Sequence, residues 1–125
     1  MDVNGVKAAI QTYFDAGYES SSEKMAEVFH DVANLYGRDE NGALSVMDKA
    51  TFIKLVGSGA LPEGQKPSYP RQDELLSIDF TGENTAVARL KIRVGNTMFT
   101  DVLSFINLGG KWVIIAKLYS GVPVD

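Results

Sequence analysis

The sequence contains no cysteine and a single histidine, His30, and each scarcity removes a class of chemistry. Without cysteine, the chain can form no disulfide, no thiolate nucleophile and no cysteine-ligated zinc site. With one histidine it can form no multi-histidine metal centre, so we predict neither a metal site nor a bound cofactor. His30 follows a predicted short helix, a position that favours a capping or surface role over catalysis.

Basic charge is also scarce, because 12 lysines and arginines stand against 16 aspartates and glutamates, for a net charge of -4. An acidic chain with no basic run is a poor binder of the phosphate backbone, so we expect no nucleic-acid partner. No apolar run approaches the roughly 18 residues of a membrane span, and the first ten residues do not resemble a secretory signal. We therefore expect a cytoplasmic protein that does not contact a membrane.

The length of the chain predicts one domain over residues 1–125, and its first half has the apolar spacing of helices. The pattern predicts a helix over about 3–17 and a short second helix that begins at a capping box of Ser20 and Glu23. A third helix is expected after Asp48, whose side chain is suited to cap it. Between the second and third helices lies a predicted hairpin with the turn Asn41-Gly42 and strands at 32–36 and 43–47.

A loop rich in glycine and proline, at residues 57–71, separates the helices from a second half of predicted strands. Loops of this length are often functional lids or mobile segments. Four strand-like runs follow, and the short breaks between them are typical of antiparallel neighbours. These runs span residues 74–80, 85–94, 97–107 and 111–120. Helices followed by an antiparallel meander predict an α+β fold, with the helices on one face of the sheet.

The last two predicted strands are apolar on both faces. An antiparallel sheet that is covered on one face only should alternate apolar and polar residues. A chain of this size has no further elements to cover the second face, so we predict a homodimer through it. The expected dimer face is the row Trp112, Ile114 and Leu118. The alternative is a scatter of exposed apolar residues, which is common in monomers.

Asp101 and Lys117 each interrupt an apolar row of these two strands. A three-residue turn over 108–110 would place Asp101 opposite Lys117, whereas a two-residue turn would place Asp101 opposite Leu118. The three-residue turn is preferred because it pairs the charges, and an unpaired buried charge costs several kcal/mol. Three interpretations of the two residues stay open: a polar anchor at the floor of a pocket, a structural ion pair, or solvent-exposed positions at the edge of the sheet.

The order of elements and four short strings resemble the nuclear transport factor 2-like superfamily, in the branch called SnoaL-like or putative lumazine-binding. The strings are Tyr13-Phe14-Asp15, Val28-Phe29-His30-x-x-Ala33, Phe99-Thr100-Asp101-x-Leu103-Ser104 and Gly110-Lys111-Trp112-x-Ile114-Ile115-x-Lys117. The resemblance covers most of the chain. It implies a cone-shaped α+β fold in which three N-terminal helices pack into a curved antiparallel sheet, with a pocket inside the cone.

The resemblance also gives a test for one known chemistry of the superfamily. Its steroid isomerases use a tyrosine of the first helix, an aspartate general base after the first strand and a protonated aspartate on a late strand. Matching the strings places Tyr13 and Asp101 at the first and third positions, while the base position falls on Gly37. The nearest carboxylates, Asp39 and Glu40, lie in the predicted turn, so the missing base argues against this reaction.

Three hypotheses of function follow. The first is a small-molecule-binding protein whose aromatic-lined pocket takes a small hydrophobic or aromatic ligand with one or two polar groups. The second is an enzyme of the isomerase, dehydratase or cyclase type, in which Asp101 acts with Tyr13 or Lys117. The third is a dimeric interaction module without a ligand. The expected pocket residues are Tyr13, Tyr36, Phe52, Phe99, Asp101, Phe105, Lys117 and Tyr119.

Overall fold

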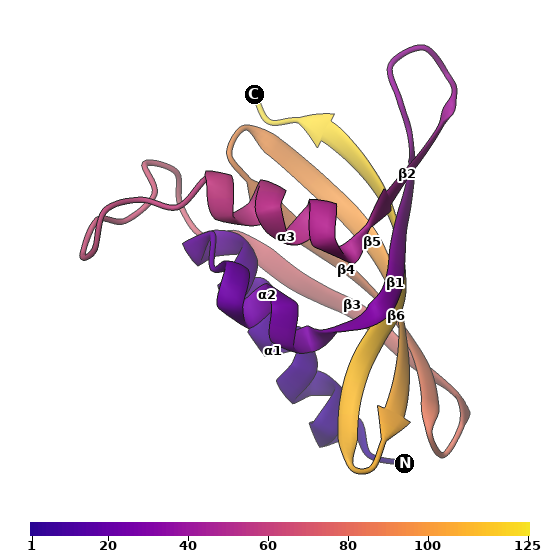
Figure 1. The fold of residues 1–125 in the computed structure, drawn as a ribbon. Helices are drawn as coiled ribbons and strands as arrows, with labels where there is room; N and C mark the ends of the chain where they lie inside the picture. Colours follow the sequence, from indigo (N-terminus) through magenta and orange to yellow (C-terminus); the bar gives the residue numbers. More distant parts are fainter.

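Three helices and one six-stranded sheet account for most of the chain in a computed structural model that describes residues 1–125 (Figure 1). The helices are α1 (Val3–Glu19), α2 (Ser22–Val28) and α3 (Lys49–Ser58). The strands are β1 (Phe29–Arg38), β2 (Leu44–Asp48), β3 (Asp73–Gly82), β4 (Thr85–Val94), β5 (Thr97–Leu108) and β6 (Lys111–Pro123). No helix has the length and apolar character needed to cross a membrane.

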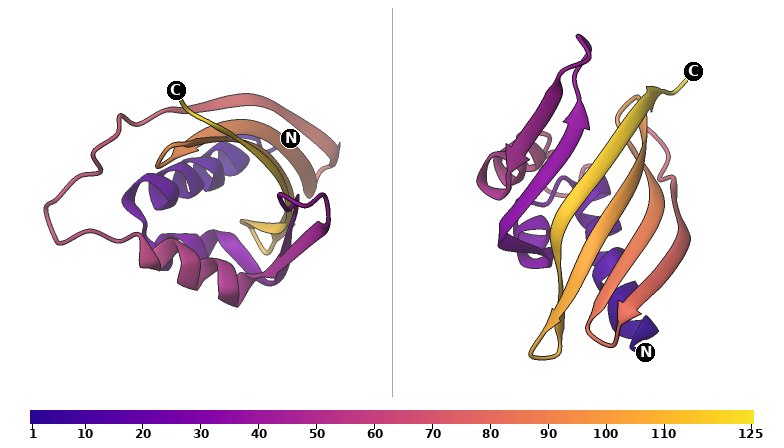
Figure 2. Two further views of the ribbon diagram at one scale, coloured as in Figure 1. Left: turned by 90° about the horizontal axis from the view of Figure 1, so that it is seen from above. Right: turned by 90° about the vertical axis from the view of Figure 1, so that its right-hand side faces the viewer.

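The sheet is strongly curved and not closed, and the helices lie inside its curve (Figure 2). Its strand order is β2-β1-β6-β5-β4-β3, so the meander of β3 to β6 is extended by the hairpin of β1 and β2. This arrangement confirms the predicted α+β cone. One pair departs from the expected antiparallel sheet, because β1 runs parallel to β6. No tight turn joins these two strands, so the direction of β1 is not constrained as it is in a hairpin.

The core lies between the helices and the inner face of the sheet. Val6, Ile10 and Phe14 present one face of α1 to it, as the apolar spacing predicts. Opposite them, Leu90 and Leu103 are fully buried on the central strands. The helices therefore pack against the concave face of the curved sheet. They do not fill it completely, and a cavity remains near the C-terminal ends of α1 and α3.

The helix caps are only partly those expected. Asp48 caps α3 as predicted, because its Oδ1 accepts a hydrogen bond from the Thr51 amide at 2.8 Å. The predicted capping box of Ser20 and Glu23 is wrong. Ser20 ends α1 in the left-handed region, with φ 53°, and Ser21 caps α2 by accepting from the Lys24 amide at 3.1 Å. Three consecutive serines, Ser20 to Ser22, lie between the end of α1 and the start of α2. Residue spacing alone does not show which of them ends the first helix and which caps the second.

The turn between β5 and β6 has two residues, so the predicted three-residue turn is wrong. Gly109 and Gly110 both have positive φ, at 63° and 93°, and Leu108 pairs with Lys111. This register holds as far as the pair Phe105 and Ile114, after which β6 contains one extra residue, Ile115. Such a bulge shifts every later pair by one position.

Beyond the bulge, Leu103 pairs with Lys117 and Asp101 pairs with Tyr119. Asp101 and Lys117 are therefore diagonal neighbours on one face, although they are not directly opposite each other. The bulge in β6 returns Lys117 to the inner face, which Asp101 already occupies on β5, so the two charges come close without a three-residue turn.

Because of the same bulge, the prediction that Trp112, Ile114 and Leu118 form one dimer face is wrong. Before the bulge, Trp112 and Ile114 face the helices and are buried in the core, where Nε1 of Trp112 donates to Oδ2 of Asp2 at 2.9 Å. Leu118, after the bulge, lies on the outer face and is 57% exposed. The three residues cannot form one surface, because the alternation of β6 changes face at Ile115.

Candidate functional site

A cavity of about 490 Å³ opens between the C-terminal ends of α1 and α3 and the nearby ends of the strands. Its lining is mainly apolar and aromatic, as expected of a small-molecule site. The lining residues are Tyr13, Gly17, Ser20, Met25, Leu35, Met47, Phe52, Leu55, Val56, Ser58, Gly59, Ile92, Val94, Thr97, Phe99, Lys117 and Tyr119. These include no histidine, cysteine or carboxylate, so the lining offers no set of metal ligands.

Lys117 is the one charged side chain that lines this cavity. The side chain is 9% exposed, and its Nζ lies over three aromatic rings, 4.6 Å from the ring centre of Phe52, 5.2 Å from Tyr13 and 5.6 Å from Tyr119. Such ring faces attract a cation by their quadrupole but accept no conventional hydrogen bond. No protein acceptor lies within hydrogen-bonding distance of Nζ, so its three N–H donors are available to a bound molecule.

Asp101 lies directly behind Lys117 and Tyr13, fully buried and outside the cavity lining. Its Oδ2 accepts a hydrogen bond from the Tyr13 hydroxyl at 2.5 Å and lies 3.8 Å from Nζ of Lys117. The second distance is within ion-pair range but too long for a hydrogen bond. Oδ1 of Asp101 has no hydrogen-bond partner at all. The carboxylate therefore acts on the cavity only through Tyr13 and Lys117.

Burial shifts the acid–base properties of all three groups. It raises the pKa of Asp101, although the charge of Lys117 and the hydrogen bond from Tyr13 oppose the shift. It lowers the pKa of Lys117, although Asp101 opposes that shift. Burial and the adjacent Asp101 raise the pKa of Tyr13 well above its ordinary value, so Tyr13 remains a hydrogen-bond donor. The raised pKa of Asp101 and the lowered pKa of Lys117 both favour transfer of a proton from Lys117 to Asp101.

Comparison with known proteins agrees with this fold. The model of the family described as "Putative lumazine-binding" matches residues 1–120. The chain belongs to this family. A nuclear transport factor 2-like protein of unknown function from Silicibacter pomeroyi DSS-3 has a TM-score of 0.83 at 20% identity, covering 96% of this chain and 95% of the other. One from Methylobacillus flagellatus KT has a TM-score of 0.81 at 24% identity, covering 97% and 92%.

A curated relative of this lumazine-binding-family chain bears a name that states an activity. It is Aldolase FrzH of Cladobotryum sp, which is 25% identical over 124 residues, covering 98% of this chain and 93% of the relative. The solved structures at lower identity establish the nuclear transport factor 2-like fold alone. The residues of the cavity must therefore carry any statement about chemistry.

The position that matches the general base of the steroid isomerases is filled by an aromatic ring in this family member. A Cβ built on Gly37 would lie 2.5 Å from Cζ of Tyr119, so the ring of Tyr119 occupies the space of a side chain at position 37. Phe99 packs edge-on against the same ring, with the ring centres 6.2 Å apart. The nearest carboxylate in sequence, Asp39, instead accepts from the amides of Asn41 and Ala43 and holds the hairpin turn.

Five of the eight expected pocket residues line the cavity, namely Tyr13, Phe52, Phe99, Lys117 and Tyr119. The other three do not. Tyr36 points to the outer face, because its neighbours Leu35 and Gly37 take the inner positions of β1. Phe105 is buried in the core, farther along β5 than the cavity reaches, and Asp101 lies behind the lining.

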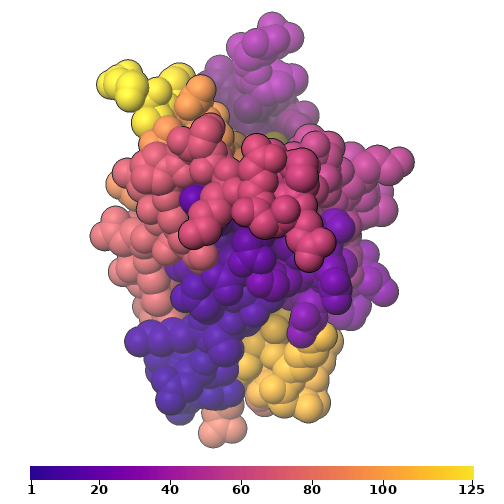
Figure 3. All heavy atoms as spheres, turned by 90° about the vertical axis from the view of Figure 1, so that its left-hand side faces the viewer, coloured from indigo at the N-terminus to yellow at the C-terminus, as the bar shows by residue number.

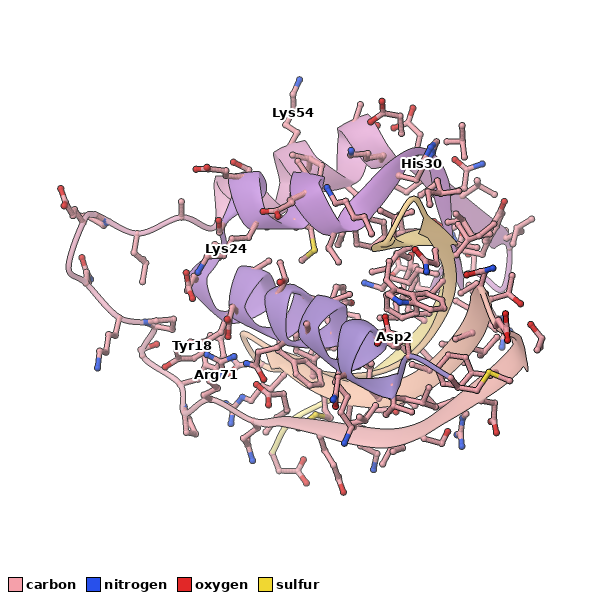
Figure 4. All side chains as sticks on the ribbon, turned by 90° about the horizontal axis from the view of Figure 1, so that it is seen from below. Asp2, Tyr18, Lys24, His30, Lys54 and Arg71 are labelled. Atoms are coloured by element: carbon pink, nitrogen blue, oxygen red, sulfur yellow. The ribbon has the colours of Figure 1, made fainter.

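The cavity lining also contains three serine and threonine residues that were not predicted from the sequence, namely Ser20, Ser58 and Thr97. Thr97 could have been found, since it shares the inner row of β5 with Phe99. Ser20 and Ser58 carry no such signal, because they reach the cavity from the ends of two helices. His30 lies at the edge of the molecule on β1, away from the cavity (Figure 4).

The long loop, which begins after α3 and ends before β3, passes across the helices beside the cavity (Figure 3). Its far end is held by Arg71, which forms ion pairs with Asp15 of α1 and with Asp73 at the start of β3. Figure 4 shows Arg71 beside Tyr18 of α1. The Tyr18 hydroxyl also donates to the backbone oxygen of Tyr69 at 3.3 Å. The loop is therefore anchored at this end, and its start at Gly59 forms part of the cavity lining.

Proposed function

We propose that this protein binds a small, flat and mostly apolar molecule in the cavity, and that an oxygen atom of this molecule accepts a hydrogen bond from Lys117. The observation that carries the proposal is the Nζ of Lys117, a buried donor group that faces the cavity without a protein acceptor. A buried charged group without hydrogen bonds is costly. A carbonyl or carboxylate oxygen of a ligand would supply the missing acceptor.

The shape and chemistry of the cavity support the same class of ligand. Its volume of about 490 Å³ lies within the range of small-molecule sites. Phe52, Phe99 and Tyr119 line the cavity, and Phe99 packs edge-on against Tyr119, so a flat ring system would find aromatic surface to pack against. The family description, which names lumazine binding, also favours a small-molecule ligand.

The test is a thermal-shift screen of a metabolite library on the wild type and two variants. A ligand present at 100 times its Kd adds about 2.7 kcal/mol to the free energy of unfolding, which raises the Tm by several degrees. We expect a hit to stabilise the wild type and Lys111→Met, an exposed position on the same strand. The same hit should not stabilise Lys117→Met.

Lys117→Met leaves the buried Asp101 without its cation, so the double variant Asp101→Asn with Lys117→Met controls for folding. If every hit stabilises the folded double variant as much as the wild type, Lys117 is not the ligand anchor. If no compound of the library stabilises the wild type, the proposed binding function fails for that chemistry.

An enzyme that acts on carbonyl compounds is the second candidate function. The name of Aldolase FrzH favours it, as does a lysine in an apolar cavity with a carboxylate behind it. An isomerase with a carboxylate base is disfavoured, because no carboxylate lines the cavity. The discriminating measurement is turnover of a ketone or aldehyde that has first been found to bind.

The homodimer remains a prediction, now for a different surface. The outer face of the sheet carries Val102, Ile115, Leu118 and Val122, and the last two are more than half exposed. We propose that two copies pair through this face. Light scattering of the wild type and Leu118→Lys tests the pairing, and a wild type that is monomeric at all concentrations would contradict it.

A further inference from the structure

We propose that the side-chain amine of Lys117 forms a Schiff base with the carbonyl carbon of a small ketone or aldehyde bound in the cavity. The inference rests on the proposed binding function and names the substrate class of the same site. Lys117 is the only amine among the lining residues. The other nucleophilic groups are hydroxyls, and no histidine or carboxylate lines the cavity to activate them.

The surroundings of Lys117 make its ammonium group easier to deprotonate than that of an exposed lysine. Three aromatic rings, from α1, α3 and β6, surround Nζ and exclude water from most of the side chain. The titratable groups that face Nζ are Tyr13 from α1, Asp101 from β5 and Tyr119 from its own strand. Asp101 favours the charged form by its charge, although it lies at 3.8 Å without a hydrogen bond, and the ring faces favour this form by their quadrupoles. Burial acts against the charged form and lowers the pKa of Lys117.

Asp101 is also placed to hold the proton that the amine must lose. Its Oδ2 already accepts from the Tyr13 hydroxyl, but Oδ1 has no partner, so the carboxyl group has a free position for a proton. Burial raises the pKa of this carboxyl group, which favours the protonated acid over the carboxylate. The transfer replaces two buried charges by two neutral groups.

The reaction needs no oxidant, reductant or metal. Lys117 gives one proton to Asp101, and the nitrogen lone pair then forms a bond to the carbonyl carbon. The carbonyl π electrons move to oxygen, which takes one of the two protons on the nitrogen, and this gives a carbinolamine. The hydroxyl group then takes the proton that Asp101 holds, returned through the nitrogen, and leaves as water while the nitrogen lone pair forms the carbon–nitrogen double bond. One carbonyl and one ammonium group thus yield one protonated imine and one water, and Asp101 is again a carboxylate.

A protonated imine draws electrons from the carbon beside it. A carbon–hydrogen bond at that carbon can then break when the water released by the condensation takes the proton, and the electron pair of the bond forms an enamine. The mostly apolar lining of the cavity suits such an intermediate, because an imine in open water is readily hydrolysed. Lys117 would therefore act as a nucleophilic catalyst for reactions next to a carbonyl group.

The test uses benzoylacetone and the smaller acetylacetone as probes at neutral pH. A diketone of this type condenses with a neutral amine and forms a conjugated enaminone, which absorbs in the near ultraviolet and needs no reductant. We expect one adduct per chain, with a mass increase of one probe minus one water, and peptide mapping should place it at Lys117. Lys117→Arg, which keeps the charge, should form no adduct, and Lys111→Met should react like the wild type.

The proposal is tested by the rate at which the probe reacts with Lys117 relative to Lys111. A lower pKa raises the neutral fraction of an amine at neutral pH, so Lys117 should react faster than the exposed Lys111. In denaturant the two lysines should react equally. Equal rates in the folded protein, or no adduct from either probe, would overturn the Schiff base. Mapping on the wild type makes this conclusion independent of whether a variant folds.

The proposed binding function can survive this failure. Chemical-shift changes at the amides of Phe99 and Tyr119, measured with each probe, report binding without covalent reaction. Shifts without an adduct would leave Lys117 as a hydrogen-bonding anchor and remove it as a nucleophile. An adduct at Lys117 that does not form in Lys117→Arg supports both the site and its chemistry.

Discussion

The protein contains two clusters of opposite charges, one at the floor of the cavity and one where the loop meets α1, and they are built differently. Below the loop, Arg71 donates to Asp15 and Asp73 at 2.5 and 2.9 Å, and all three side chains are partly exposed. At the cavity floor, Lys117 makes no hydrogen bond and Asp101 leaves one oxygen without a partner.

The difference indicates what each cluster does. In the exposed cluster Arg71 donates a hydrogen bond to each carboxylate and the desolvation cost is low, which suits an anchor for a loop. The buried pair carries a large desolvation cost with incomplete hydrogen bonds, and apolar residues of similar volume often stabilise a fold at least as well. Incomplete pairing beside a cavity is instead what a binding or reacting site requires, because the free donor is kept for the ligand.

The largest expected effect is on the buried pair. Asp101→Ala leaves the Lys117 ammonium buried without its carboxylate and removes the acceptor of the Tyr13 hydroxyl. Breaking a buried pair in this way costs about 3 to 5 kcal/mol. Urea unfolding monitored by circular dichroism measures it, and Asp15→Ala in the exposed cluster is the matched control. A loss no larger than that of the control would mean that Lys117 is neutral in the folded protein.

A smaller effect is expected where the wall of the cavity has no room for a side chain. Gly37→Ala places a Cβ against the ring of Tyr119, which must move. Such overpacking costs about 1 to 3 kcal/mol and should weaken binding of any hit from the screen. Gly82→Ala is the control, since its Cβ would meet only the Thr85 hydroxyl oxygen at 3.4 Å. Unchanged ligand stabilisation in Gly37→Ala would show that the ligand does not contact Tyr119.

The two clusters should respond to pH with opposite signs. Burial raises the pKa of Asp101, so its contribution to stability is complete below the unfolded pKa of about 3.9 and is lost as pH rises through the folded value. Partial burial would also raise the pKa of Asp15, but hydrogen bonds from Arg71 and Gln11 lower it. The contribution of Asp15 is therefore present above about 3.9 and lost as pH falls through its folded pKa.

Free energies of unfolding measured between about pH 3 and pH 7 test this contrast. One titrating group changes the slope of the unfolding free energy against pH by at most about 1.4 kcal/mol per pH unit. Asp101→Asn should make stability rise more steeply with pH, because it removes a contribution that declines. Asp15→Asn should make it rise less steeply. Two changes of the same sign would contradict the assigned directions.

The smallest effect is expected at the exposed cluster. Arg71→Ala removes two ion pairs and a cation–π contact with Tyr18. Exposed pairs contribute about 0 to 1 kcal/mol each, so the loss of two should lower the free energy of unfolding by about 2 kcal/mol at most. Faster proteolysis of the loop, with little change in global stability, is the expected signature. A loss comparable to that of Asp101→Ala would remove the distinction between the two clusters.

Several parts of the fold could be predicted because they depend on neighbours in the chain. The apolar spacing of α1, the cap at Asp48 and the glycine turn of the β1–β2 hairpin are such local signals, and the structure confirms them. The resemblance to the nuclear transport factor 2-like superfamily supplied the arrangement of these elements. The match of the family model over residues 1–120 confirms this resemblance.

The candidate site was predicted less completely, for an identifiable reason. Lys117 and Asp101 stood out because charges interrupt apolar rows, and that signal was correct. The expected role of Tyr36 was wrong, because the side chain faces outward. The lining also includes residues from helix ends and from β2, and no periodic pattern indicates which of these reach one cavity.

By itself, the sequence determined the elements, the inner faces of the helices and the presence of two buried opposite charges, because each depends on spacing along the chain. Only the tertiary structure decided how those charges meet. A bulge at Ile115 changes the alternation of β6, so that Trp112 and Ile114 enter the core while Lys117 and Tyr119 face the cavity. Packing against the helices selects this arrangement, because a β6 without the bulge would place either Trp112 or Lys117 on the outer face of the sheet.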